Sequence, residues 1–192
     1  MRSSKQEHIM NEALRIIGRE GMGRLTLSRL SSGIGVSEGA IYRHFDSKTA
    51  IIKEILNDLF FRVSNRMLEE IHQDKPVNDK LRDLIKQLYA MFEEQPAYVS
   101  LLFSEEYFFA NQEIFYLMHT IVSSMQLYIR QILEQGKERH EIRSNLDIQD
   151  LSLLIMGSLR ITVINWRLKR NHSELTIAGT RLLNSLLEVT AA

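Results

Sequence analysis

The placement of glycine and proline constrains this chain more than any other feature. Six of the nine glycines lie within the first 39 residues, whereas residues 40–192 hold three glycines and both prolines. Because glycine and proline interrupt helices and strands, we expect short elements in the first segment and long elements in the rest. No Asn-Gly or Asp-Gly pair lies between alternating apolar runs, so the sequence gives no sign of a β-hairpin.

Apolar side chains recur with the helical period along almost the whole chain. Gly21 is expected to end the first helix, and Gly136 is expected to end a long helix that begins at Asn111. Two residues with side chains that commonly cap helices, Asp147 and Ser173, mark the starts of the last two. The sequence therefore predicts nine or ten helices, no strand and an all-α fold.

The formal charge of the chain is zero, but its distribution is uneven. The 24 basic residues are balanced by 24 acidic ones. Residues 1–53 hold nine basic and five acidic side chains, a net charge of +4, and the remainder carries −4. Such an asymmetry suggests a basic contact surface joined to a second part. We expect a DNA-binding domain over residues 1–50 and a helical domain over residues 51–192.

Two short helices joined by a tight turn give the sharpest local signal. Thr26 is expected to cap the first of them, and Ser37 to cap a second helix over residues 38–45. Gly35 between them tolerates a left-handed backbone without steric cost, and Val36 is expected to fill the angle between the helices. This arrangement predicts a helix-turn-helix.

The outward face of the 38–45 helix suits the major groove of DNA. Gly39 and Ala40 are small enough to let the helix backbone approach base edges, and Arg43 is the natural reader of guanine. Donors around them suit phosphate groups. The residues predicted to contact DNA are Thr26, Ser37, Glu38, Gly39, Ala40, Tyr42, Arg43, His44 and Lys48. Short helices with glycine turns also occur in ordinary helical proteins, so the pattern alone leaves DNA binding and a plain surface open.

The stretch Leu25-Thr26-Leu27, followed by Gly-Val-Ser-Glu-Gly-Ala-Ile-Tyr-Arg-His-Phe-Asp-Ser-Lys at residues 35–48, resembles the DNA-binding domain of TetR/AcrR-family transcriptional regulators. The resemblance spans about residues 5–55, with at least six motif positions in register. It implies a dimeric DNA-binding regulator, usually a repressor that a small ligand releases.

The resemblance also divides the predicted contacts into two kinds. By this match the phosphate-contacting positions are Thr26, Tyr42, His44 and Lys48, and the base-facing positions are Glu38, Gly39, Ala40 and Arg43. The chain departs from the family pattern at Ser31 and Ile34, where the family usually has alanine. These departures concern local packing rather than the face toward DNA.

Aromatic and methionine residues gather in the second part of the chain. Cavities lined by such side chains suit apolar or planar ligands, and a small lipophilic or aromatic effector is therefore expected. The predicted lining residues are Tyr89, Phe92, Phe103, Tyr107, Phe108, Met125, Tyr128 and Met156. Ordinary core packing is the alternative interpretation of the same pattern.

The last two predicted helices carry apolar side chains on more than one face. A helix that is apolar all round must be covered all round, either by its own domain or by a second subunit. We expect a four-helix homodimer interface. Its predicted residues are Leu151, Leu154, Gly157, Ser158, Ile161, Leu175, Ala178, Gly179, Leu182 and Leu186.

No motif indicates an enzyme, a cofactor or a metal. The chain has no cysteine, its six histidines are scattered, and neither a phosphate-binding loop nor a dinucleotide fingerprint is present. The first residues are polar and no apolar run approaches a membrane span of about 20 residues, so a cytoplasmic protein is expected. A regulator controlled by a protein partner instead of a ligand, and a helical enzyme with an unrecognised site, remain the alternatives.

Overall fold

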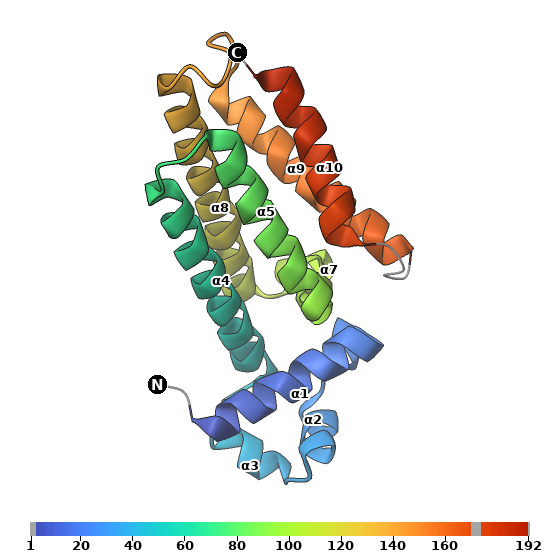
Figure 1. The fold of residues 1–192 in the computed structure, drawn as a ribbon. Coiled ribbons are helices and arrows are strands. Elements are labelled where there is room, and N and C mark those ends of the chain that lie inside the picture. The colour runs from blue at the N-terminus through green and yellow to red at the C-terminus, as the bar shows by residue number, and fades with distance from the viewer. Residues whose placement is uncertain (1–2, 170–173, 192) are drawn as a thin grey trace. The chain divides into compact units, whose positions relative to one another are not determined.

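The structure is a computed structural model that describes residues 3–169 and 174–191 (Figure 1). Within these residues the chain forms ten α-helices, one 3-10 turn at Met22–Arg24 and no strand, which confirms the all-α fold. The helices are α1 (Ser4–Glu20), α2 (Leu27–Ile34), α3 (Glu38–Tyr42), α4 (Lys48–His72), α5 (Val77–Glu94), α6 (Ala97–Leu102), α7 (Glu105–Ala110), α8 (Gln112–Glu138), α9 (Ile148–Leu168) and α10 (Leu175–Thr190).

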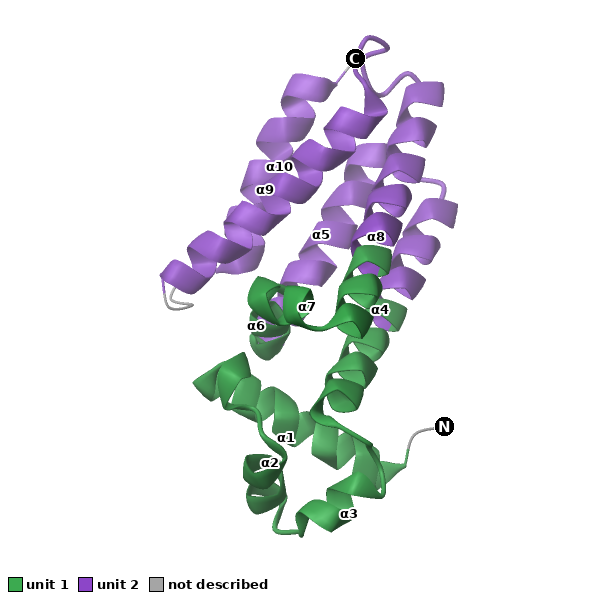
Figure 2. Cartoon of the chain, turned by 180° about the vertical axis from the view of Figure 1, so that it is seen from behind, with its two compact units in different colours: residues 1–61, 95–120 green, residues 62–94, 121–192 purple. Residues whose placement is uncertain are grey.

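The chain divides into two compact units (Figure 2). Unit 1 holds residues 1–61 and 95–120, and unit 2 holds residues 62–94 and 121–192. Both α4 and α8 contribute residues to each unit. The domain boundary predicted after residue 50 marks the end of the DNA-binding part, and it stays a prediction.

The core of unit 1 is built on one face of α1. Ser3 caps this helix, since its Oγ accepts a hydrogen bond of 3.2 Å from the Gln6 amide. The apolar face that the period predicted is buried, with Ile16 and Ile17 almost fully covered. Gly18 faces α6 so closely that a Cβ there would lie 3.3 Å from Cβ of Ala97. The first helix therefore packs against both α2 and α6.

Two predicted helix boundaries differ from the structure. Gly136 lies inside α8, which continues to Glu138. A Cβ at this position would lie 2.9 Å from both Val77 and Ile142, so the glycine serves close packing rather than helix termination. The predicted cap Ser173 lies outside the described residues.

Tyr89 is the largest side chain that is fully buried, at 1% exposure. It lies in unit 2, where its ring packs against Gly179 of α10 at a distance that leaves no room for a Cβ. Burial raises the pKa of Tyr89 to about 12, although a hydrogen bond with Thr162 opposes the shift. The phenol is therefore held neutral in the interface between α5, α9 and α10.

The raised pKa of Tyr89 predicts a loss of stability at high pH. The unfolded phenol ionises near pH 10 and the folded one near pH 12, so the unfolded state binds fewer protons between these values and stability falls as the pH rises through them. A shift of two units corresponds to about 2.7 kcal/mol. Chemical denaturation from pH 9 to 12 should show a smaller decline for Tyr89→Phe than for the parent chain. Parallel curves would contradict the assignment.

Lys80 forms a second buried anchor in unit 2, at 1% exposure. Its ammonium group donates hydrogen bonds of 2.9 Å to the Ile71 carbonyl and 2.7 Å to Oε1 of Gln135. Burial lowers the pKa of Lys80 from its ordinary value. One side chain therefore joins the end of α4 to α5 and α8.

Among the described residues, α9 is long and apolar enough to cross a membrane by length and composition. This corrects the expectation that no segment approaches such a span. Only 33% of its most apolar window is buried, and the mean hydropathy there is 1.2. A single helix of this kind is weak support for a membrane span, because apolar helices of soluble proteins share these properties.

Candidate nucleic-acid interface

The turn between α2 and α3 has the geometry that its sequence predicts. The hydroxyl of Thr26 accepts a hydrogen bond of 3.2 Å from the Arg29 amide, and Oγ of Ser37 accepts one of 3.3 Å from the Ala40 amide. Gly35 ends α2 with a left-handed backbone at φ 70°. A side chain at this φ would be strained, so glycine fixes the direction in which α3 leaves the turn.

The angle between α2 and α3 is closed by Leu30 and Ile41, which are fully buried, together with Phe45. Val36 does not fill this angle as predicted, because it is 43% exposed. Its amide donates to the Ser31 carbonyl at 3.0 Å, which holds the residue at the outer edge of the turn. Ser31 itself is buried and donates from its hydroxyl to the Ser28 carbonyl at 2.9 Å.

Helix α3, which we call the recognition helix, is shorter than the helix predicted over residues 38–45. It ends at Tyr42 rather than at Phe45, and Arg43 and His44 lie in the turn that follows. The buried Phe45 ring anchors this turn from the inside. The turn leaves the Arg43 side chain exposed.

The predicted DNA-contacting residues all belong to unit 1. Those that are exposed are Thr26, Ser37, Glu38, Gly39, Tyr42 and Arg43. The half-buried ones are Ala40, His44 and Lys48. None is fully buried, so the whole set is accessible to a ligand of unit 1.

Lys48, the first residue of α4, lies above an aromatic ring. Its Nζ is 5.2 Å from the centre of the Tyr107 ring, a cation–π contact that offsets the unfavourable position of a cation at a helix N-terminus. The Tyr107 hydroxyl lies 3.3 Å from Oγ1 of Thr49, which also accepts a hydrogen bond from Asn111. Tyr107 supports the start of α4 through these contacts, and its assignment to a ligand site stays a prediction.

The other residues predicted to bind a ligand are dispersed. Tyr89, Phe92 and Phe108 are buried in the core, whereas Phe103, Met125, Tyr128 and Met156 are half-buried. Of these seven, Phe103 and Phe108 belong to unit 1 and the rest to unit 2. The helical period of the sequence identifies these positions as an apolar stripe, but it does not distinguish residues of the core from residues that line a cavity.

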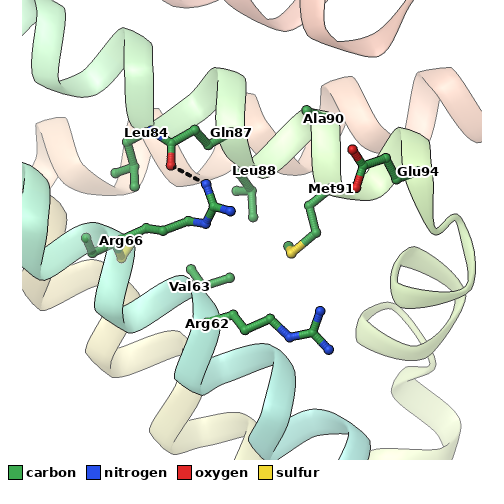
Figure 3. A pocket seen from close by; sticks show the side chains of 10 residues that line it. Arg62, Val63, Arg66, Leu84, Gln87, Leu88, Ala90, Met91 and Glu94 are labelled. Carbon is green, nitrogen blue, oxygen red and sulfur yellow. Dashed lines mark hydrogen bonds between the residues drawn. The ribbon is translucent and has the colours of Figure 1, made fainter.

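Unit 2 holds a partly open pocket of about 240 Å³ between α4 and α5 (Figure 3). It is lined by Arg62, Val63, Arg66, Met67, Leu84, Gln87, Leu88, Ala90, Met91 and Glu94. None of the eight predicted ligand-binding residues is among them. The sequence feature that could have indicated this pocket is a pair of arginines, Arg62 and Arg66, which lie one helical turn apart beside the apolar stripe of α4.

The predicted interface residues fall into two groups. Leu151, Leu175 and Gly179 are buried within the chain and so are not available to a second subunit. The residues left accessible are Leu154, Gly157, Ser158, Ile161, Ala178, Leu182 and Leu186. Leu154 is 60% exposed and Ile161 49%. An apolar face of α9 and α10 is therefore uncovered.

Among the described residues, no group of three or more metal-binding side chains lies together.

A capped helix-turn-helix with an exposed recognition helix, joined to a larger helical unit, defines the class of helix-turn-helix DNA-binding regulators. Residues 9–55 match the family model described as bacterial regulatory proteins, tetR family. Residues 56–188 match the model described as YsiA-like protein, C-terminal region.

The chain belongs to the TetR family of transcriptional regulators and is not an enzyme. It is 29% identical over 143 residues to the nucleoid occlusion factor SlmA of Aliivibrio fischeri, covering 73% of this chain and 71% of that protein. The solved structure of the fatty acid degradation regulator FadR from Bacillus halodurans has a TM-score of 0.85 at 20% identity, covering 97% and 96% of the two chains. FadR from Bacillus subtilis in complex with stearoyl-CoA has a TM-score of 0.79 at 22% identity, covering 95% and 96%.

Proposed function

We propose that this chain is a cytoplasmic repressor that binds a roughly palindromic operator as a homodimer and is released by a small lipophilic ligand. The pocket between α4 and α5 carries the ligand part of this proposal. Two arginines, Arg62 and Arg66, lie beside an apolar wall that includes Leu88 and Met91 (Figure 3). Positive charge next to an apolar surface suits an amphiphile with an anionic group.

The chemistry of the pocket points to a fatty acyl-CoA, whose CoA phosphates are anionic, or to another anionic lipid. FadR from Bacillus subtilis was solved with stearoyl-CoA, which has this chemistry. The volume of about 240 Å³ is below the usual range of about 300–1,000 Å³ for ligand sites. Met67 and Met91 are unbranched, flexible side chains that re-pack easily, so the pocket widens at low cost around an acyl chain.

The uncovered apolar face of α9 and α10 supports a homodimer. Leu154 and Ile161 on α9, and Leu182 on α10, are large apolar side chains that are 42% exposed or more. A second copy of the chain that covers them through a two-fold axis would present two recognition helices. Half-sites of the operator are then spaced by about 34–36 Å or a multiple of it.

Helix α4 is the proposed link between ligand and DNA. Lys48 at its first residue belongs to the DNA-binding face, and Arg62 and Arg66 of the same helix line the pocket. A ligand that shifts α4 would alter the spacing of the two recognition helices and release the operator.

The proposal is tested by a mobility-shift assay on the DNA upstream of the chain's own gene. The parent chain should bind as a dimer, and palmitoyl-CoA should release it at micromolar concentration. Arg62→Ala together with Arg66→Ala should retain DNA binding and require at least tenfold more acyl-CoA for release, whereas Lys86→Ala on the exposed side of α5 should respond normally. A monomer in sedimentation, or release that does not depend on the arginines, contradicts the proposal.

Control by a protein partner is a second candidate, favoured by an exposed aromatic cluster in unit 1. Phe109, Phe115 and Tyr116 are 76%, 40% and 60% exposed, and the Phe115 ring lies 5.9 Å from Phe109 and 5.8 Å from Tyr116. Exposed apolar clusters mark interaction surfaces. DNA binding that ignores acyl ligands but changes with Phe109→Ser and Tyr116→Ser in cell extract would favour this candidate.

A further inference from the structure

The N-terminus of α1 lies beside α3 in unit 1 (Figure 1), and the two helices enclose a groove. This groove has a volume of about 480 Å³. Its lining residues are Ser4, Lys5, His8, Ile9, Ile34, Val36, Ala40, Arg43 and His44. Residues of α1 therefore share one concave surface with residues predicted to contact DNA.

The groove combines a basic rim with an apolar floor. Lys5 and His8 contribute from α1, and Arg43 and His44 contribute from the turn after α3. None of the nine lining residues is acidic. A phosphate group with its deoxyribose ring has the matching chemistry, since an anion lies next to an apolar ring along the backbone of DNA.

The position of Lys5 in α1 also points to an anion. Lys5 lies in the first turn, where the helix dipole is positive and a cation lowers helix stability. The capping box of Ser3 and Gln6 holds this turn rigid, with Ser3 N–H donating to Oε1 of Gln6 at 3.0 Å. His8, three residues after Lys5, lies on the same side of the helix. An anion in the groove offsets the unfavourable charge.

We propose that Lys5 and His8 bind a backbone phosphate of the operator and extend the DNA interface beyond the helix-turn-helix. The phosphate contacts Lys5 and His8, and its deoxyribose contacts Val36, while Ala40 and Arg43 at the other side of the groove face the bases. This contact adds affinity without reading sequence. The inference rests on the proposed operator binding, and it assigns to α1 a function that the helix-turn-helix motif does not include.

The experiment measures the affinity of the full chain for its operator and for a scrambled duplex at several salt concentrations. Lys5→Ala should weaken binding to both duplexes by the same factor, about five- to tenfold at 0.1 M salt, and lower the salt slope by about one. Lys5→Arg should restore most of the affinity. Lys86→Ala, which removes an exposed lysine of α5, should change neither quantity.

A duplex series with one neutral methylphosphonate at each backbone position locates the contact. One position should weaken the parent chain several-fold and leave Lys5→Ala unaffected, because the two changes remove the same interaction. Loss of affinity for the operator alone would overturn the inference in favour of base reading, and an unchanged salt slope would overturn it outright. If free inorganic phosphate at millimolar concentration competed for the parent chain as strongly as duplex DNA does, the groove would be a site for a free anion, and this result would also overturn the inference. Failure of the parent chain to bind any operator contradicts the proposed function instead.

Discussion

Arg43→Ala should remove base preference at one position of each operator half-site. A bidentate pair between arginine and guanine is worth about 1–3 kcal/mol of discrimination, which corresponds to a loss of selectivity of about 5- to 150-fold. Affinity for a scrambled duplex should fall far less. The measurement is competition binding against a set of operators in which each base pair is changed in turn.

The structure gives the reason for this expectation. Arg43 directly follows the last residue of α3 and its side chain is exposed, while Gly39 and Ala40 leave the helix surface low enough to approach bases. Arg24, an exposed arginine of the 3-10 turn, provides the matched control, since Arg24→Ala should leave the base preference intact. Affinity that falls equally for every sequence in Arg43→Ala would show that Arg43 contacts phosphate only.

The local geometry of the helix-turn-helix could be predicted because it depends on neighbouring residues. Thr26, Gly35 and Ser37 each act through hydrogen bonds or backbone angles within five positions along the chain. The end of α3 was predicted too late for a related reason. Helical spacing accounts for Ile41 and Phe45 equally, and only the packing of Phe45 shows that the backbone leaves the helix first.

Contacts between distant segments could not be predicted from the sequence. Tyr107 and Lys48 are separated by nearly sixty residues, so nothing in the aromatic pattern marked this ring as a partner of a lysine. Gly136 reads as a helix terminator until its closeness to Val77 is known. On α9 and α10 both apolar stripes satisfy the helical period, and the sequence alone does not show that Leu151 and Leu175 face inward while Leu154 faces outward.

Gly179→Ala should destabilise unit 2 more than any other single methyl group added to a glycine of this chain. A Cβ at this position would overlap the ring of Tyr89, which is fully buried and cannot move into solvent. Overpacking of this kind costs about 3 kcal/mol, so the melting temperature should fall by about 6–12 °C for a chain of this size. Thermal and urea unfolding at one protein concentration measure the change.

Two further variants separate overpacking from a general effect of alanine. Gly23 in the 3-10 turn of unit 1 has open space around its Cβ position, so Gly23→Ala should leave the stability unchanged or raise it by up to about 1 kcal/mol. In a Tyr89→Leu background the ring is gone, and Gly179→Ala should then cost under about 1 kcal/mol because the two positions share one contact. An undiminished cost in that background would mean that the backbone of α10, rather than the Tyr89 ring, requires the glycine. The buried tyrosine and the glycine would then be independent features of the interface between α5 and α10.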